Sequence, residues 1–112
     1  MFVLKEESTF DWNAKAMVPI DGKRKAVQFM ARFNILDMDR QDELLGNPET
    51  RDVKQFLEAA LVKFWDLNVQ DAQGNEIEDD SERNAIISKN PIFIEALTDA
   101  YGIGVLNYKP KN

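Results

Sequence analysis

The feature that most constrains the fold is a stripe of apolar residues in the segment Val53–Val69. Its members recur at intervals of three and four residues, as on one face of an α-helix. They are Val53, Phe56, Leu57, Ala60, Leu61, Phe64 and Trp65. Asn47 and Pro48 suit the start of this helix, because the Asn side chain can accept from free backbone N–H groups and proline has no N–H to satisfy there. The pattern predicts one long core helix that the rest of the chain covers.

Two runs of alternating polarity precede this stripe. In Thr9–Val18 and in Lys25–Ile35, apolar and polar residues alternate, which is typical of half-buried β-strands. Asp21-Gly22 between them tolerates the positive φ that a tight hairpin turn requires. Because two strands alone are marginally stable, the hairpin needs helices or a third strand against it. Phe2–Leu4 is a candidate for a further short strand.

Further helices are expected on either side of the stripe. Asp37 suits the cap of a short helix over Met38–Leu45, which Gly46 closes. After the stripe, the turn-rich segment Gln70–Glu76 is expected to form a loop with a small hairpin. The loop would separate the core helix from the helices that follow.

The last third of the chain predicts two more helices. Asp80 or Ser81 can cap a third helix that runs to about residue 89. Asn90-Pro91 repeats the Asn-Pro pattern and starts a fourth helix, expected to end at Gly102 or Gly104. Residues after this point are expected to form a tail.

These elements predict an α+β fold, in which an N-terminal antiparallel β-hairpin or small three-stranded sheet packs on three to four α-helices. One domain over 1–112 is expected, with a β-sheet portion over 1–36, a helical portion over 37–104 and a tail over 105–112. The expected core residues are Phe10, Trp12, Phe29, Phe33, Phe56, Leu57, Leu61, Phe64, Trp65, Leu97 and Tyr101.

Composition excludes several classes of function. The 112 residues include neither Cys nor His, which removes disulfides, thiolate metal sites and the commonest general base. No apolar run approaches the roughly 20 residues that cross a bilayer, and the acidic start MFVLKEES differs from a signal peptide. A cytoplasmic protein without a membrane partner is therefore expected. The net charge is −6, and the segment Asp66–Glu82 holds seven acidic and no basic residues, which disfavours binding to nucleic acid.

The acidic segment does not fit a calcium loop, which needs a glycine at its sixth position and a glutamate at its twelfth. Counted from Asp66, the sixth residue is Asp71; counted from Asp71, the twelfth is Glu82 but Gly74 is only the fourth. A solvated loop with helix-capping acids is the interpretation we favour. The sequence also lacks a nucleophile elbow, a dinucleotide-binding glycine motif and a Walker A loop. We therefore expect no metal, no cofactor and no catalysis.

Apolar residues outside the core faces are the candidates for partner contact. Ile92 and Ile94 lie about 100° to either side of the residue between them, so they cannot share its face of the helix. Ile103, Val105 and Leu106 extend the apolar surface past the expected helix end. Exposed, these residues would form a patch for self-association or for a protein partner. Buried, they would belong to a helix that is covered on most sides.

The order of the segments TFDWNAKAMVP, AVQFMARFNILD, FLEAALVKFWDL, DAQGNEI and ISKNPIFIEALTDAYGIG resembles small tail assembly chaperones of long-tailed bacteriophages. In that family a sheet leads into helices, the long helix ends in a Trp, a D-x-x-G-N-like loop follows and the last helix ends in a Tyr. The likeness covers residues 9–104, and Arg32 and Asn34 depart from it at outward strand positions. The matching positions are Trp12, Phe29, Phe33, Phe56, Leu57, Trp65, Asp71, Gly74, Asn75, Pro91, Leu97 and Tyr101.

The resemblance implies a non-catalytic protein of the bacterial host cytoplasm. Such proteins coat and solubilise the tape measure protein, the long helical chain that sets tail length, and help other tail components assemble around it. The resemblance also implies a homo-oligomer and, in many members, a longer form made by translational frameshifting. An apolar groove rimmed by acids would accept a client helix, and many weak contacts along one client would add through effective concentration.

Two other functions stay open at this point. An acidic inhibitor or DNA mimic, acting on a nucleic-acid enzyme, would spread carboxylates along one face at phosphate-like spacing, whereas here the acids cluster in one loop. A carboxylate enzyme would need a deep pocket in which two acids have well-separated pKa values. Glu78, Asp79 and Asp80 are adjacent on an expected loop, where solvation is usual.

Overall fold

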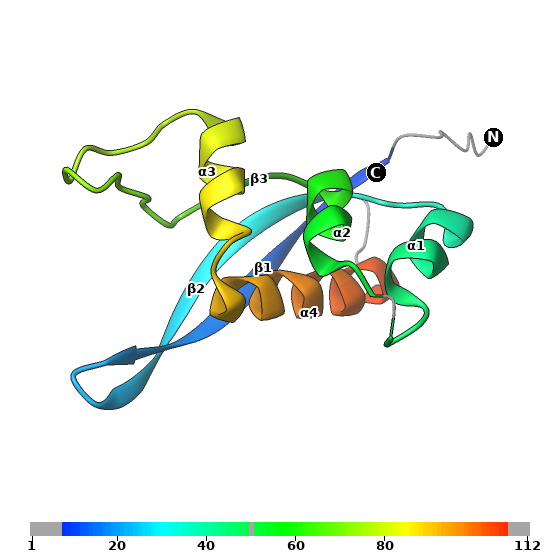
Figure 1. The fold of residues 1–112 in the computed structure, drawn as a ribbon, viewed down its shortest axis with the longest axis horizontal. Coiled ribbons are helices and arrows are strands. Elements are labelled where there is room, and N and C mark those ends of the chain that lie inside the picture. Colours follow the sequence, from blue (N-terminus) through cyan, green and yellow to red (C-terminus); the bar gives the residue numbers. More distant parts are fainter. Residues whose placement is uncertain (1–7, 50, 108–112) are drawn as a thin grey trace.

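The computed structural model describes residues 8–49 and 51–107, which form a three-stranded antiparallel sheet and four helices (Figure 1). The elements in chain order are β1 (Thr9–Ile20), β2 (Lys23–Asn34), α1 (Met38–Leu45), α2 (Val53–Ala60), β3 (Leu61–Trp65), α3 (Asp80–Ile87) and α4 (Pro91–Asn107). The sheet order is β1-β2-β3, which confirms the α+β class. The candidate strand Phe2–Leu4 lies outside the described residues.

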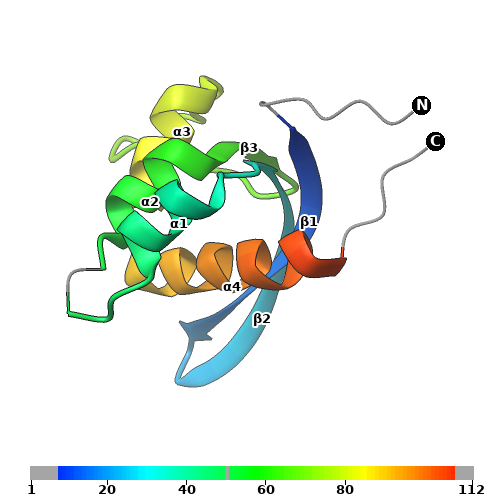
Figure 2. The ribbon, with the colours of Figure 1, turned by 90° about the vertical axis from the view of Figure 1, so that its right-hand side faces the viewer.

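The predicted hairpin is present and slightly longer than expected. Asp21 and Gly22 form its turn with φ of 50° and 76°, as a tight hairpin turn requires. Phe10 pairs with Phe33. In each strand, the residues that point toward the helices alternate with residues that point away from them. Figure 2 shows the helices gathered on one side of the sheet, so the hairpin has one covered and one open face.

The segment predicted as one long helix is divided between a helix and a strand. α2 ends at Ala60, and the chain continues directly into β3, which pairs antiparallel with β2. The prediction of a single helix over 53–69 is therefore wrong after Ala60. The β-branched and aromatic residues of LVKFW favour a strand, and a strand satisfies the backbone groups along the edge of β2, which a helix would leave unpaired.

A β-bulge explains why the apolar spacing imitates a helix. Phe33 pairs with Leu61, while the preceding residue of β2 pairs with Lys63, so Val62 is the extra residue. Leu61 and Phe64 are three residues apart and would point to opposite faces of a regular strand. The bulge instead turns both side chains onto the covered face, where both are buried.

Two helix caps lie at or near the expected positions. Asp37 caps α1, and its carboxylate accepts a hydrogen bond from the backbone N–H of Arg40 at 2.8 Å, as predicted. For α3 the cap is Asp79, one residue before the expected Asp80 or Ser81. Because several acids are adjacent here, the sequence alone does not show which carboxylate caps the helix. The path of the preceding loop decides it.

The start of α2 corrects a prediction. Asn47 accepts from the backbone N–H of Glu49 and so forms a local turn rather than a helix cap. Asp52 caps α2 instead, because its carboxylate accepts from the N–H of Gln55 at 3.0 Å. The backbone N–H of Asp52 also donates to the carbonyl of Leu44, which ties this start to α1.

α4 starts as predicted at Asn90-Pro91, where the Asn90 side chain accepts from the N–H of Ile92 at 3.0 Å. It does not end at either glycine but continues to Asn107, so residues 105–107 are helical rather than part of a tail. Gly104 allows a close crossing, since a Cβ there would lie 2.5 Å from the Phe10 ring. Contact with β1 offsets the roughly 1 kcal/mol that a helical glycine costs.

Tyr101 of α4 lies at the centre of the core. Its ring stands 4.8 Å from that of Phe56, nearly perpendicular to it, and 5.7 Å from that of Phe33. Its hydroxyl accepts from the N–H of Leu36 at 3.2 Å and donates to Oε1 of Gln41 at 3.1 Å. One residue thus joins α4 to the sheet, to α2 and to the start of the helical portion. Burial raises the pKa of the Tyr101 phenol above its ordinary value.

Most expected core residues are buried. These are Phe10, Phe29, Phe33, Phe56, Leu57, Leu61, Phe64, Leu97 and Tyr101. Trp12 is half-buried against them, and Trp65 is half-buried with the guanidinium of Arg32 5.5 Å from its ring centroid. Within the described ranges, no helix is long and apolar enough to cross a membrane.

Candidate functional site

The residues expected to contact partners all lie on α4, but they face different surroundings. Ile94 and Val105 are half-buried and pack against the core cluster. Ile103 and Leu106 remain 54% and 84% exposed. Ile92 is half-buried at the other end of the helix. The five residues therefore do not form one continuous patch, and the last two turns of the helix carry most of the exposed apolar surface.

An apolar groove of about 250 Å³ runs between α1 and the C-terminal half of α4. We name it the α1–α4 groove. Its lining residues are Gln41, Leu45, Arg51, Thr98, Tyr101, Gly102, Val105 and Leu106. Gly102 adds no side chain to this wall of the groove, and a Cβ there would meet no atom within 4 Å. The groove joins two residues predicted as contacts, Val105 and Leu106, to a leucine of α1.

Leu45 and Met38 of α1 are the apolar residues near this end of the fold that the sequence did not single out. Met38 is 76% exposed, and Leu45 lines the α1–α4 groove. Their spacing of seven residues places both on one side of the helix, which is the signal that could have identified them. The short length of α1 concealed it, because an eight-residue helix shows this repeat only once.

A second groove, of about 410 Å³, lies between β1 and the N-terminal half of α4. Its lining includes Met17 of β1 and Ile92 of α4, together with Glu95 and Asp99. Lys15 and Arg24 also line this β1–α4 groove, so its charged lining is balanced rather than acidic.

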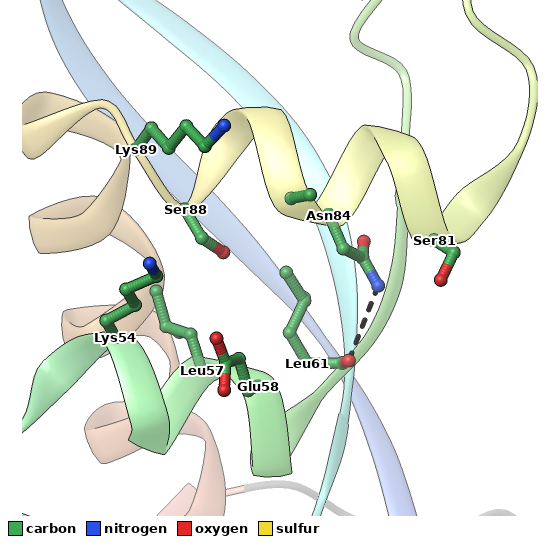
Figure 3. Close-up of a pocket in the computed structure, with 9 residues that line it drawn as sticks. Lys54, Leu57, Glu58, Leu61, Ser81, Asn84, Ser88 and Lys89 are labelled. Atoms are coloured by element: carbon green, nitrogen blue, oxygen red, sulfur yellow. Dashed lines mark hydrogen bonds between the residues drawn. The ribbon is translucent and has the colours of Figure 1, made fainter.

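A third hollow, of about 320 Å³, lies between α2 and α3 (Figure 3). Lys54 and Glu58 reach it from α2, and Lys89 reaches it from the end of α3, but all three side chains are exposed. Asn84 points from α3 toward β3, where its amide nitrogen donates to the carbonyls of Val62 at 2.9 Å and Leu61 at 3.5 Å. The hollow is therefore a solvated crevice whose floor holds a structural asparagine.

Among the described residues, Oδ1 of Asn84 is buried without a hydrogen-bond partner. No hydrogen bond joins Lys54, Glu58 and Lys89 to one another or to Asn84 within the same ranges. A nucleophile beside its base, held by a third group, is the arrangement that covalent catalysis requires. The α2–α3 crevice does not present that arrangement.

The acidic loop is organised by one carboxylate. Asp71 accepts hydrogen bonds from the backbone N–H groups of Gln73 and Asn75, both at 2.9 Å. The bond from Asn75 is the main reason why the pKa of this carboxyl lies below its ordinary value. The loop closes with a bridge between Gln70 and Glu76, as the turn-rich sequence predicted. In the ranges that the structure describes, no three acidic side chains converge to hold a metal ion.

Arg83 is a further residue that sequence reasoning missed. It is buried on α3 and donates to the carbonyl of Leu67 at 2.7 Å and to that of Phe64 at 3.3 Å. Its guanidinium also lies 4.4 Å from the centroid of the Phe64 ring. A single arginine on an otherwise acidic helix gave no signal of burial, because its partners are backbone carbonyls that any sequence carries.

Comparisons of this chain with protein-family models, with curated proteins and with solved structures find no significant match.

Proposed function

We propose that this chain is a non-catalytic tail assembly chaperone of a long-tailed phage or prophage. In this role it binds and solubilises the tape measure protein in the bacterial host cytoplasm, acts as an oligomer and cooperates with other tail components. The observation that supports the proposal most is the α1–α4 groove, since it places an apolar channel beside Leu106, the most exposed large apolar residue described. An exposed apolar groove is a common mark of a site for a protein partner.

The length of the groove suits a helical client. Between Thr98 and Leu106, α4 advances about 12 Å at a rise of 1.5 Å per residue. An amphipathic helix that docks in a groove uses anchors at positions i, i+4 and i+7, which span about 10 Å. The α1–α4 groove therefore matches two turns of such a helix. Each contact would be weak alone, and many copies along one client would add through effective concentration.

The charge of the chain supports a role in keeping an apolar client dissolved. Arg51 is the charged residue among those that line the α1–α4 groove, whereas the chain as a whole has a net charge of −6. Asp39, Asp42 and Glu43 are exposed on α1, beside the groove rather than in it. Copies arrayed along a client would thus bury apolar surface and present acids to solvent and to each other, which opposes aggregation.

The test uses co-expression with the tape measure protein encoded in the same tail gene cluster. In Leu106→Asp, a charge would occupy the mouth of the groove, and we expect the tape measure protein to move from the soluble to the insoluble fraction. The control is Ile86→Asp, which places the same charge at an exposed isoleucine of α3, away from the groove. Equal client solubility with Leu106→Asp and with the unchanged chain would contradict the proposed site.

A further inference from the structure

The two edge strands of the sheet, β3 and β1, differ in whether side chains hydrogen-bond to their outward backbone groups. At the β3 edge, α3 lies alongside the strand (Figure 1). Side chains of α3 donate hydrogen bonds to β3 carbonyls that face away from β2. Asn84 donates to the carbonyl of Val62, and Arg83 donates to that of Phe64. An edge strand covered in this way cannot pair with another chain.

The β1 edge differs. α4 packs along β1, and Lys15 and Met17 line the groove between them, but within the described residues no side chain donates to a carbonyl of β1 between residues 11 and 17. Pro19 lies in β1 and has no N–H, and a proline inside a sheet is accepted where its nitrogen faces away from the neighbouring strand. Because backbone direction alternates along a strand, the N–H and C=O groups of Asp11, Asn13, Lys15 and Met17 share that outward direction. No described residue forms a backbone hydrogen bond with this outward side between residues 11 and 17.

We propose that β1 pairs antiparallel with β1 of a second copy of this chain, so that two three-stranded sheets join into one. The two-fold axis passes between Asn13 of one copy and Asn13 of the other. This inference gives an interface for the oligomer that the proposed function includes, but it is argued from the edge of the sheet and does not need the client. It uses the edge rather than the α1–α4 groove, which stays free in both copies.

The side chains specify this register. With Asn13 on the axis, Asp11 lies opposite Lys15 of the second copy, and both residues are exposed on the open face. Asp11 already forms a two-pronged ion pair with Arg32, at 2.8 and 3.2 Å, whereas Lys15 makes no ion pair among the described residues. The second copy would supply the missing partner of each Lys15.

Registers in which the second strand slips by two residues lose the Asp11–Lys15 pair, and those in which it slips by four are worse. An axis at Asp11 would set two aspartates opposite each other, and an axis at Lys15 would set two lysines opposite each other, which destabilises a strand pair. On the covered face, the register centred on Asn13 sets Trp12 opposite Ala14, a large side chain against a small one. The three central pairs alone would supply about six backbone hydrogen bonds.

The chain has no cysteine, so a single introduced thiol reports this contact without background. In the proposed dimer the two Asn13 Cα atoms lie about 5.5 Å apart, within the range that a disulfide spans. We expect Asn13→Cys to form a covalent dimer under mild oxidation at least about tenfold faster than Gln28→Cys, because pairing raises the effective concentration of the thiols. Gln28 is exposed on the same face of the sheet as Asn13, but it lies on β2, where it pairs with Lys15 and is one strand away from the β1 edge.

Light scattering of the full chain completes the test. The unchanged protein is expected to be a dimer, and Asn13→Pro a folded monomer, because proline removes an N–H that only the second copy uses. Far-ultraviolet circular dichroism verifies that this variant keeps its fold. A monomeric unchanged chain would overturn the proposal, and so would equal cross-linking rates for the two cysteine variants. Loss of client binding with an intact dimer would instead count against the chaperone role alone.

Discussion

Arg83 donates a hydrogen bond of 2.7 Å from its guanidinium to the backbone carbonyl of Leu67, and this contact fixes how α3 covers the sheet. The same side chain reaches the carbonyls of Phe64 and Ile77 and packs over the Phe64 ring. A buried guanidinium whose described partners are carbonyls in three places holds β3, the chain after it and α3 in one arrangement.

Replacing Arg83 with Met should lower the free energy of unfolding by about 3 kcal/mol, because buried carbonyls lose their donor while the apolar stem is kept. Arg83→Lys should lose less, since an ammonium can still reach one carbonyl but lacks the planar fork that reaches several. Urea denaturation of the three proteins measures the difference. Equal stability of Arg83→Met and the unchanged chain would show that solvent satisfies these carbonyls.

Two glycines of α4 form a matched pair. At Gly104 a Cβ would lie 2.5 Å from the Phe10 ring and 2.9 Å from Trp12. Gly104→Ala should therefore destabilise the fold by about 1–3 kcal/mol through overpacking against β1. At Gly102 a Cβ would meet nothing within 4 Å, so Gly102→Ala should stabilise the helix by up to about 1 kcal/mol. Thermal unfolding of both variants tests the opposite signs, and a gain in Tm for Gly104→Ala would refute the close crossing.

Tyr101 should make stability depend on alkaline pH. Because its pKa is raised in the folded chain, an unfolded tyrosine releases its proton first as pH rises above about 10. The stability that Tyr101 contributes through this pKa difference is complete below that pH. It is lost progressively as pH rises toward the higher pKa of the folded chain. Tyr101→Phe should lack this part of the alkaline loss, which denaturation at a series of pH values detects. A parallel loss in both proteins would assign it to other groups.

The same variant should be less stable at neutral pH. Phenylalanine cannot accept from the N–H of Leu36 or donate to Gln41, and the loss of these bonds should cost about 1–2 kcal/mol. Denaturation at pH 7 measures this cost separately from the alkaline effect. A variant as stable as the unchanged chain would mean that Tyr101 stabilises the fold through its ring contacts and not through its hydroxyl.

The sequence predicted those parts of the fold whose signals are local. Alternating polarity around Asp21-Gly22 predicted the hairpin, and Asp37 predicted the start of α1. Each of these signals depends on residues within one turn or strand. The strand β3 was missed because the bulge at Val62 lets a spacing of three serve a strand as well as a helix. That ambiguity is resolved only by the unpaired edge of β2, which lies about 30 residues earlier in the chain.

For the candidate site too, features that depend on the tertiary fold could not be predicted from the sequence. The sequence left open whether Ile103 and Leu106 are exposed or buried, and both are exposed. The sequence did not separate them from Ile94 and Val105, which pack on the core, because the buried face of α4 depends on how the helix crosses β1 at Gly104. The α1–α4 groove also needs Leu45, whose position beside α4 is a property of the tertiary fold.

Amide hydrogen exchange with and without the tape measure protein tests the central claim most directly, namely that the chain lends its α1–α4 groove to a client helix. The account predicts slower exchange over residues 38–45 and 98–107 in the complex, with little change around the turn at Asp21 and Gly22. Protection confined to the α2–α3 crevice, or no change along α4, would contradict it.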